Sequence, residues 1–130
     1  MSEAALRRAW IAAILVLVAL IVAGSLSPKA LVPNESLSDK TGHFLAYLSL
    51  ALLGSGIATP SGLWRTMLRC FLLGASLELA QALLTENRMA DVADLAANAA
   101  GILTAWLIAG QGRAGWGLRA AAWLGGRRSS

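Results

Sequence analysis

Three groups of polar residues in this apolar chain have the types and spacings of ligand-binding or catalytic residues. Within each group the residues are three, four or seven positions apart, so they share one face of a helix. The groups are His43 with Tyr47, Glu78 with Gln81 and Thr85, and Asp91 with Asp94 and Asn98. An imidazole beside a carboxyl group can act as a general acid and base pair. The candidates for this role are His43, Glu78 and Asp94.

Membrane-crossing helices are the elements that must position these groups. The chain is 57% hydrophobic and 14% charged, and a bilayer core about 30 Å thick needs about 20 apolar residues in a helix. Stretches of about this length lie at residues 9–26, 42–61, 66–84 and 92–109. Because hydrocarbon offers no partner to an open backbone, we predict an all-α membrane bundle of four transmembrane helices within residues 1–110.

The first stretch has a second interpretation as a signal peptide, with Arg7 and Arg8 ahead of an apolar run and small residues near Ala23. The run exceeds the usual apolar region of about 7–15 residues in such peptides, which favours a transmembrane helix.

The cations indicate the orientation of the bundle. Eight arginines fall on the side of the two termini and three cations on the other side, so the positive-inside rule places both termini in the cytoplasm. The net charge of +4 is then a topology signal, and we expect no nucleic-acid partner. Residues 111–130 form a basic cytoplasmic tail with Trp116 and Trp123. The glycines of this tail make a stable helix doubtful, and a disordered tail is the alternative.

This topology places the three polar groups at one depth near the outer face of the membrane. A carboxylate within a transmembrane helix costs at least about 2.5–3.5 kcal/mol, so Glu78 must face the bundle. The polar groups either form a hydrogen-bonded plug that fixes helix register or line a site that opens outward.

The sequence contains no compact metal-binding motif and a single cysteine, Cys70. We therefore expect no metal, no cofactor and no intramolecular disulfide. The alternative is a divalent-metal site with hard ligands from His43, Glu78, Asp91 and Asp94.

The chain resembles the VanZ-like family of small membrane proteins in three blocks that occur in family order between about residues 24 and 109. The blocks begin at Asp39-Lys40-Thr-Gly-His43, at Glu78-Leu-Ala-Gln81 and at Arg88-Met-Ala-Asp91. The resemblance implies a multi-spanning helical protein of the bacterial cytoplasmic (inner) membrane, and one branch of the family is associated with lowered sensitivity to the glycopeptide teicoplanin. The shared polar positions map onto Asp39, Lys40, His43, Tyr47, Glu78, Gln81, Arg88, Asp91, Asp94 and Asn98.

We therefore expect an outward-facing polar pocket that handles a membrane lipid, a lipid-linked envelope precursor or a lipophilic glycopeptide antibiotic, and so contributes to antibiotic resistance or envelope homeostasis. In this hypothesis Lys40 and Arg88 attract an anionic head group, and Glu78 and His43 form the inner wall. One alternative is a membrane-embedded enzyme that acts on a lipid-linked substrate through His43, Glu78 and Asp94. Another is a proton-coupled lipid transporter in which Glu78 carries the proton. The protein partner would be a second copy of the chain or another envelope protein.

Overall fold

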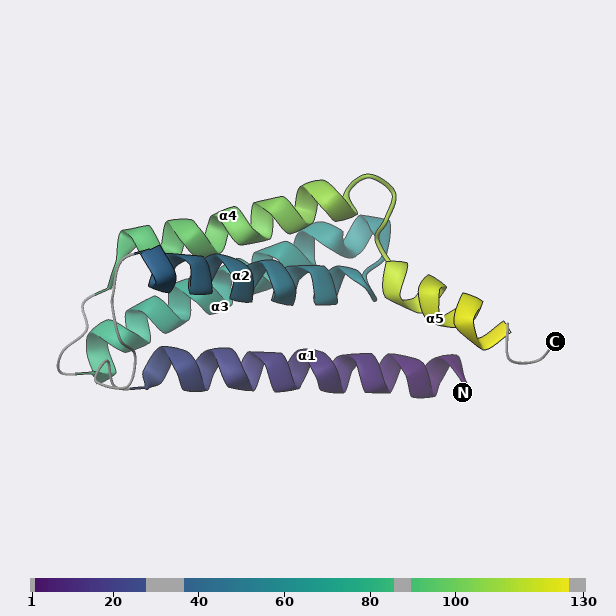
Figure 1. Ribbon diagram of the computed structural model, residues 1–130, viewed down its shortest axis with the longest axis horizontal. Helices are drawn as coiled ribbons and strands as arrows, with labels where there is room; N and C mark the ends of the chain where they lie inside the picture. The colour runs from purple at the N-terminus through teal and green to yellow at the C-terminus, as the bar shows by residue number, and fades with distance from the viewer. Residues whose placement is uncertain (1, 28–36, 86–89, 127–130) are drawn as a thin grey trace.

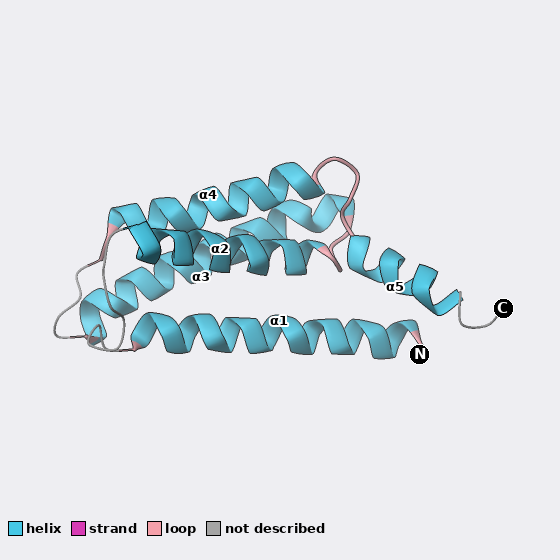
Figure 2. Cartoon of the chain, in the orientation of Figure 1, coloured by secondary structure: helices cyan, strands magenta, loops and turns pink. Residues whose placement is uncertain are grey.

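The structure is a computed structural model, and it describes residues 2–27, 37–85 and 90–126. These residues form helices without any strand, which confirms the predicted all-α class (Figures 1 and 2). The elements in chain order are α1 (Glu3–Leu26), α2 (Leu37–Ser55), the 3-10 turn η2 (Pro60–Gly62), α3 (Leu63–Leu84), α4 (Val92–Ala109) and α5 (Trp116–Gly126).

Short polar side chains begin several of these elements by accepting hydrogen bonds from backbone N–H groups that have no partner in their own helix. The hydroxyl of Ser2 accepts from the N–H of Ala5 at the start of α1, and Thr59 accepts from Gly62 at η2. The carboxylate of Asp91 accepts from the N–H of Ala93 across 2.7 Å and so begins α4. A residue of the candidate site therefore also determines where its helix starts.

Helix α2 packs most closely on α4, and small residues permit the approach. A Cβ atom at Gly101 would overlap the carbonyl oxygen of Phe44 and lie 2.9 Å from the backbone nitrogen of Leu48. A Cβ atom at Gly74 of α3 would lie 3.2 Å from both the Tyr47 ring and the Asn98 amide. The core among α2, α3 and α4 thus includes polar side chains packed at van der Waals distance.

Length and apolar composition identify three described helical segments that could cross a membrane, namely Glu3–Leu26, Pro60–Leu84 and Val92–Ala109. They correspond to the predicted stretches 9–26, 66–84 and 92–109. Leu15, Val16 and Leu20 of α1 are more than half exposed, as lipid-facing side chains would be.

The second predicted span, 42–61, differs from the helix found there, because α2 runs from Leu37 to Ser55. It begins earlier, so that Asp39 and Lys40 lie in its first turns. It ends earlier because Gly56 and Ile57 form a turn before Pro60 starts η2.

The tail forms the helix α5, whereas its glycines had suggested that a helix would be unstable. Gly112 and Gly115 have φ values of 77° and 75°, which allow the sharp turn after α4. The N–H of Gly115 then donates to the carbonyl of Ser55 across 2.7 Å, and that of Gly117 donates to Gly56 across 3.0 Å. These tertiary hydrogen bonds replace the partners that the first turn of an isolated helix lacks.

Two tryptophans connect α5 to α1 and α2. The Trp116 ring meets the Trp10 ring edge to face, with 5.3 Å between centroids. The indole N–H of Trp116 lies 3.1 Å from Ser55 Oγ and 3.2 Å from the carbonyl oxygen of Leu52. The chain's N-terminus and α5 therefore lie at one end of the bundle, opposite the start of α4 (Figure 1).

Candidate functional site

The first turns of α2 and α4 are joined by a lysine between two carboxylates. Lys40 Nζ lies 2.7 Å from Asp94 Oδ1 and 3.1 Å from Asp91 Oδ2. The Ala93 N–H and the Lys40 ammonium hold the pKa of Asp91 below its ordinary value of 3.8. The positive charge of Lys40 is therefore balanced by carboxylates within the protein. Little of this charge is left to attract an anionic head group.

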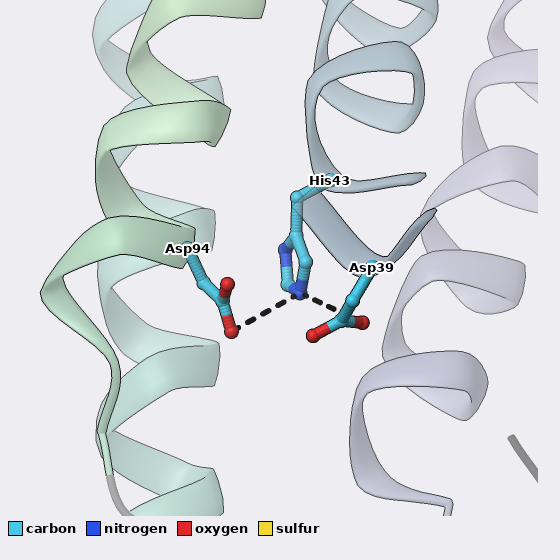
Figure 3. Close-up of side chains that lie close together, drawn as sticks. All are labelled: Asp39, His43 and Asp94. Atoms are coloured by element: carbon cyan, nitrogen blue, oxygen red, sulfur yellow. Dashed lines mark ion pairs between the residues drawn. The ribbon is translucent and has the colours of Figure 1, made fainter. Parts of the chain in front are cut away.

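His43 lies one turn after Asp39 on α2, between α2 and α4 (Figure 3). Its Nδ1 atom is 3.0 Å from Asn98 Oδ1, and Asn98 is 1% exposed. Because an amide oxygen only accepts hydrogen bonds, Nδ1 carries the proton that it donates to Asn98. Nε2 lies 3.6 Å from Asp94 Oδ2 and 4.0 Å from Asp39 Oδ1.

Two polar residues of α3, Glu78 and Gln81, contact two different neighbouring helices. Glu78 is 5% exposed, and its Oε2 atom accepts a hydrogen bond from the Asp91 N–H across 3.2 Å. Gln81, one turn later, donates to the carbonyl oxygen of Ser25 across 2.7 Å. Glu78 thus contacts the start of α4, whereas Gln81 attaches α3 to the end of α1.

Tyr47 is 1% exposed, and its hydroxyl has no hydrogen-bond partner among the described residues. A buried hydroxyl usually has a partner, so such an atom requires an explanation. Tyr47 also lines a cavity, and the hydroxyl end of its ring lies beside Gly74 of α3.

This cavity, of about 500 Å³, lies between α1 and the first half of α2. Its lining combines apolar side chains of α1 with polar side chains of α2. The lining includes Leu17, Leu20 and Ile21 on α1 and Asp39, His43 and Tyr47 on α2. Sequence reasoning missed the α1 residues, because α1 is apolar on every face and gives no periodic signal for the side that meets α2.

A comparison with protein families shows to which family the chain belongs. The family model described as VanZ/LLP1 matches residues 9–111. The chain belongs to the VanZ-like family. No curated protein and no solved structure matches it. The family match begins before the resemblance seen at residue 24 and includes the α1 residues that line the cavity.

The structure brings together most of the polar residues predicted for the site. Direct polar contacts connect Asp39, Lys40, His43, Glu78, Asp91, Asp94 and Asn98. Tyr47 packs beside Asn98, whereas Gln81 bonds to α1 instead of to this network. Arg88 lies outside the described residues.

The arrangement provides two kinds of chemistry. With its proton on Nδ1, a neutral His43 leaves Nε2 free to act as a general base beside the carboxylates of Asp94 and Asp39. In the described part of the chain, the donor atoms of Asp39, His43 and Asp94 also form a group within 4.8 Å of one another that could hold a metal ion. Of the metal ligands considered from the sequence, this group contains His43 and Asp94 but neither Glu78 nor Asp91.

Proposed function

We infer that this VanZ-like protein binds an amphipathic molecule of the cell envelope in the cavity between α1 and α2. The molecule is a lipid, a lipid-linked envelope component or a lipophilic glycopeptide antibiotic, and its binding contributes to antibiotic resistance or envelope homeostasis. The cavity carries this inference, because it joins apolar side chains of one helix to polar side chains of the next. Ligand sites generally combine an apolar lining with a few convergent polar groups.

The two sides of the cavity suit the two parts of such a molecule. Leu17, Leu20 and Ile21 would contact a hydrocarbon chain, and Asp39 and His43 would lie beside the polar group. This assignment changes the expected head-group contacts, because Lys40 already pairs with two carboxylates.

For the membrane arrangement, we propose that α1, α2, α3 and α4 all cross the bacterial inner membrane, with both termini in the cytoplasm. The distribution of eight cations against three supports this orientation. Helix α2 is less apolar than α1 and α4 because Asp39, Lys40 and His43 lie in its first two turns. Those turns would lie at the outer boundary. Single cysteines are introduced at Ser2 and at Thr41 in a Cys70→Ala background. Their labelling from each side of the membrane tests whether the N-terminus lies on the inner side and the start of α2 on the outer side.

Two glycines offer a direct test of binding, because a Cβ atom at Gly24 or Gly42 would meet nothing within 4 Å and both glycines line the cavity. Gly24→Leu and Gly42→Leu should therefore fill the cavity without overlapping the backbone. The lipids that remain with the protein purified in detergent would be measured by mass spectrometry, together with binding of a photoreactive lipid.

We expect both variants to retain several-fold less lipid than the wild type. The control is Ala19→Leu, which places the same leucine side chain on an exposed face of α1. Equal retention by the wild type and both glycine variants, with unchanged thermal stability, would exclude the cavity as the binding site.

The hydrogen bond between His43 and Asn98 supports a second candidate function, that of an enzyme acting on a lipid-linked substrate. Asn98 fixes the proton on Nδ1, so Nε2 is available as a general base beside Asp94. Purified protein would be assayed for hydrolysis of phospholipids and of lipid pyrophosphates. Turnover that is lost in His43→Gln but not in Ala19→Leu would favour the enzyme, and absence of turnover in the wild type would exclude it for these substrates.

A further inference from the structure

We propose that Asp39, His43 and Asp94 bind a divalent metal ion at the polar side of the cavity between α1 and α2. Their donor atoms lie within 4.8 Å of one another. Asp39 and His43 are one turn apart on α2, and Asp94 faces them from the first turn of α4 (Figure 3). An imidazole nitrogen with two carboxylate oxygens suits zinc, manganese or iron(II).

The distances within this group exceed those of hydrogen bonds but fit a shared ion. His43 Nε2 is 3.6 Å from Asp94 Oδ2 and 4.0 Å from Asp39 Oδ1, whereas N–H···O bonds are about 2.7–3.2 Å long. Two ligands about 2.1 Å from a tetrahedral zinc ion are roughly 3.4 Å apart. Small movements of the Asp39 and Asp94 side chains would therefore complete the site.

The contact with Asn98 sets the imidazole in the form that binds metal. Because Asn98 Oδ1 accepts a hydrogen bond from Nδ1, a neutral His43 has its lone pair on Nε2, which faces two carboxylates. Either a proton on Nε2 or a metal ion among the three atoms would relieve the repulsion between this lone pair and the two negative oxygens. Metal-bound histidines characteristically donate their second ring N–H to such a partner, which fixes the tautomer.

Charge and space both favour an ion at this position. Among the described residues Lys40 contacts Asp94 but not Asp39, and it meets Asp94 through Oδ1, which leaves Oδ2 facing His43. Asp39 and His43 line the cavity, so that the open coordination positions of an ion would face a volume of about 500 Å³.

Tyr47 supplies a further polar side chain of the cavity that a ligand would contact. It lines the same cavity one turn beyond His43, and its buried hydroxyl has no hydrogen-bond partner in the described part of the chain. In a step that rests on the proposed function, an anionic oxygen of the head group would complete the coordination of the ion. The ion would thereby provide the positive charge that Lys40, paired with Asp91 and Asp94, does not.

Metal binding is measured first on the whole protein in detergent, with no added lipid. The protein is treated with a chelator, dialysed, and titrated with Zn²⁺, Mn²⁺ or Mg²⁺ by calorimetry, and bound metal is counted by mass spectrometry. We expect about one ion per chain, and a Co²⁺ derivative should show visible absorption from a site with a nitrogen ligand.

Asp39→Asn is the most informative variant, because Asp39 is one-third exposed and its described ion pair is with His43. Affinity should fall by at least about tenfold in Asp39→Asn and His43→Asn, and by about 10–100-fold in Asn98→Leu, which removes the orienting contact. Glu3→Gln removes one acidic charge from an exposed residue in the first turn of α1 and should bind metal as the wild type does. Absence of binding in the wild type, or equal affinity in Asp39→Asn and Glu3→Gln, overturns the proposal.

Different results would refute the proposal of lipid binding and the proposal of metal binding. If lipid retention falls in Gly24→Leu but the wild type binds no metal, the metal site is wrong and lipid binding stands. If metal binds while chelation leaves retention of anionic lipid unchanged, the ion does not contact the head group.

Discussion

Glu78 Oε2 accepts a hydrogen bond from the backbone N–H of Asp91 across 3.2 Å, so the buried carboxylate of α3 meets the first turn of α4. N–H groups at a helix start have no partner within the helix, and the helix dipole places partial positive charge there. Glu78 therefore links two helices of the site through a hydrogen bond to the backbone of Asp91.

Substitutions at Glu78 test this bond. Glu78→Gln keeps an oxygen that can accept from Asp91, whereas Glu78→Leu leaves the N–H without that partner. We expect Glu78→Leu to lower the free energy of unfolding by about 1–3 kcal/mol and Glu78→Gln to lower it less. Unfolding in mixed detergent, followed by circular dichroism, measures both. Equal losses would mean that the bond does not stabilise the bundle.

Growth of a deletion strain in the presence of envelope antibiotics, teicoplanin included, tests the site in the cell. Copies encoding Glu78→Gln or Asp94→Asn should restore at most a small part of the wild-type resistance, because each changes a buried charge of the network. Ala19→Leu should restore all of it. Full rescue by both site variants, with normal amounts of protein in the membrane, would remove the main support for a functional site.

The hydrogen bond that Asp91 accepts from the Ala93 N–H, together with its ion pair with Lys40, gives stability a defined dependence on pH. Because the pKa of Asp91 is lower in the folded protein than its ordinary value of 3.8, its stabilising effect is fully present above that value. The effect is lost as the pH falls through the lower folded pKa. Thermal unfolding of the wild type and Asp91→Asn would be compared between about pH 6 and pH 2. The wild type should be the more stable at the upper end, with a difference that shrinks toward the lower end; a difference constant across the range contradicts the assignment.

We expect substitution by alanine at two glycines to have opposite effects on stability. Gly101→Ala would place its Cβ against the Phe44 carbonyl and should destabilise the protein by about 1–3 kcal/mol. Gly24→Ala meets nothing within 4 Å and should leave stability unchanged or raise it by up to about 1 kcal/mol, because alanine favours helix. Thermal unfolding measures both, and similar values would contradict the close packing of α2 on α4.

Trp116→Phe tests the attachment of α5. The change removes the indole N–H that lies near the Leu52 carbonyl and Ser55 Oγ, and should cost about 1–2 kcal/mol of local stability. Cleavage by trypsin after Arg119 should become several-fold faster. Trp64→Phe, at an exposed position of α3, is the matched control and should leave the cleavage rate unchanged.

Helical spacing predicted which polar residues share a face but not how their charges pair. His43 and Asn98 lie on faces that spacing identified, and they meet across 3.0 Å. Lys40 was expected to attract a ligand, yet it pairs with Asp91 and Asp94. The sequence shows a cation near acids but not the side-chain geometry that decides whether its charge is already balanced.

The parts that sequence reasoning missed depend on tertiary contacts. Helix α5 forms because Gly115 and Gly117 donate hydrogen bonds to carbonyls at the end of α2. No local sequence pattern predicts these hydrogen bonds. The apolar lining of the cavity comes from Leu17 and Ile21, on a helix with no distinct polar face. The predicted end of the second span was too late because an apolar run continues past the turn at Gly56.

Hydrogen bonds fasten α1 near both of its ends. The indole N–H of Trp10 donates to the Leu53 carbonyl, and Gln81 donates to the Ser25 carbonyl, each across 2.7 Å. The cavity lies along α1 between these two attachments. To widen the cavity, α1 would have to bend or lose one of these two hydrogen bonds. The bonds therefore limit the width of a molecule that the cavity can hold. Under the proposed function, the occupant would be a slender acyl or polyprenyl chain, whereas the peptide part of a glycopeptide would have to stay outside and insert its fatty tail alone.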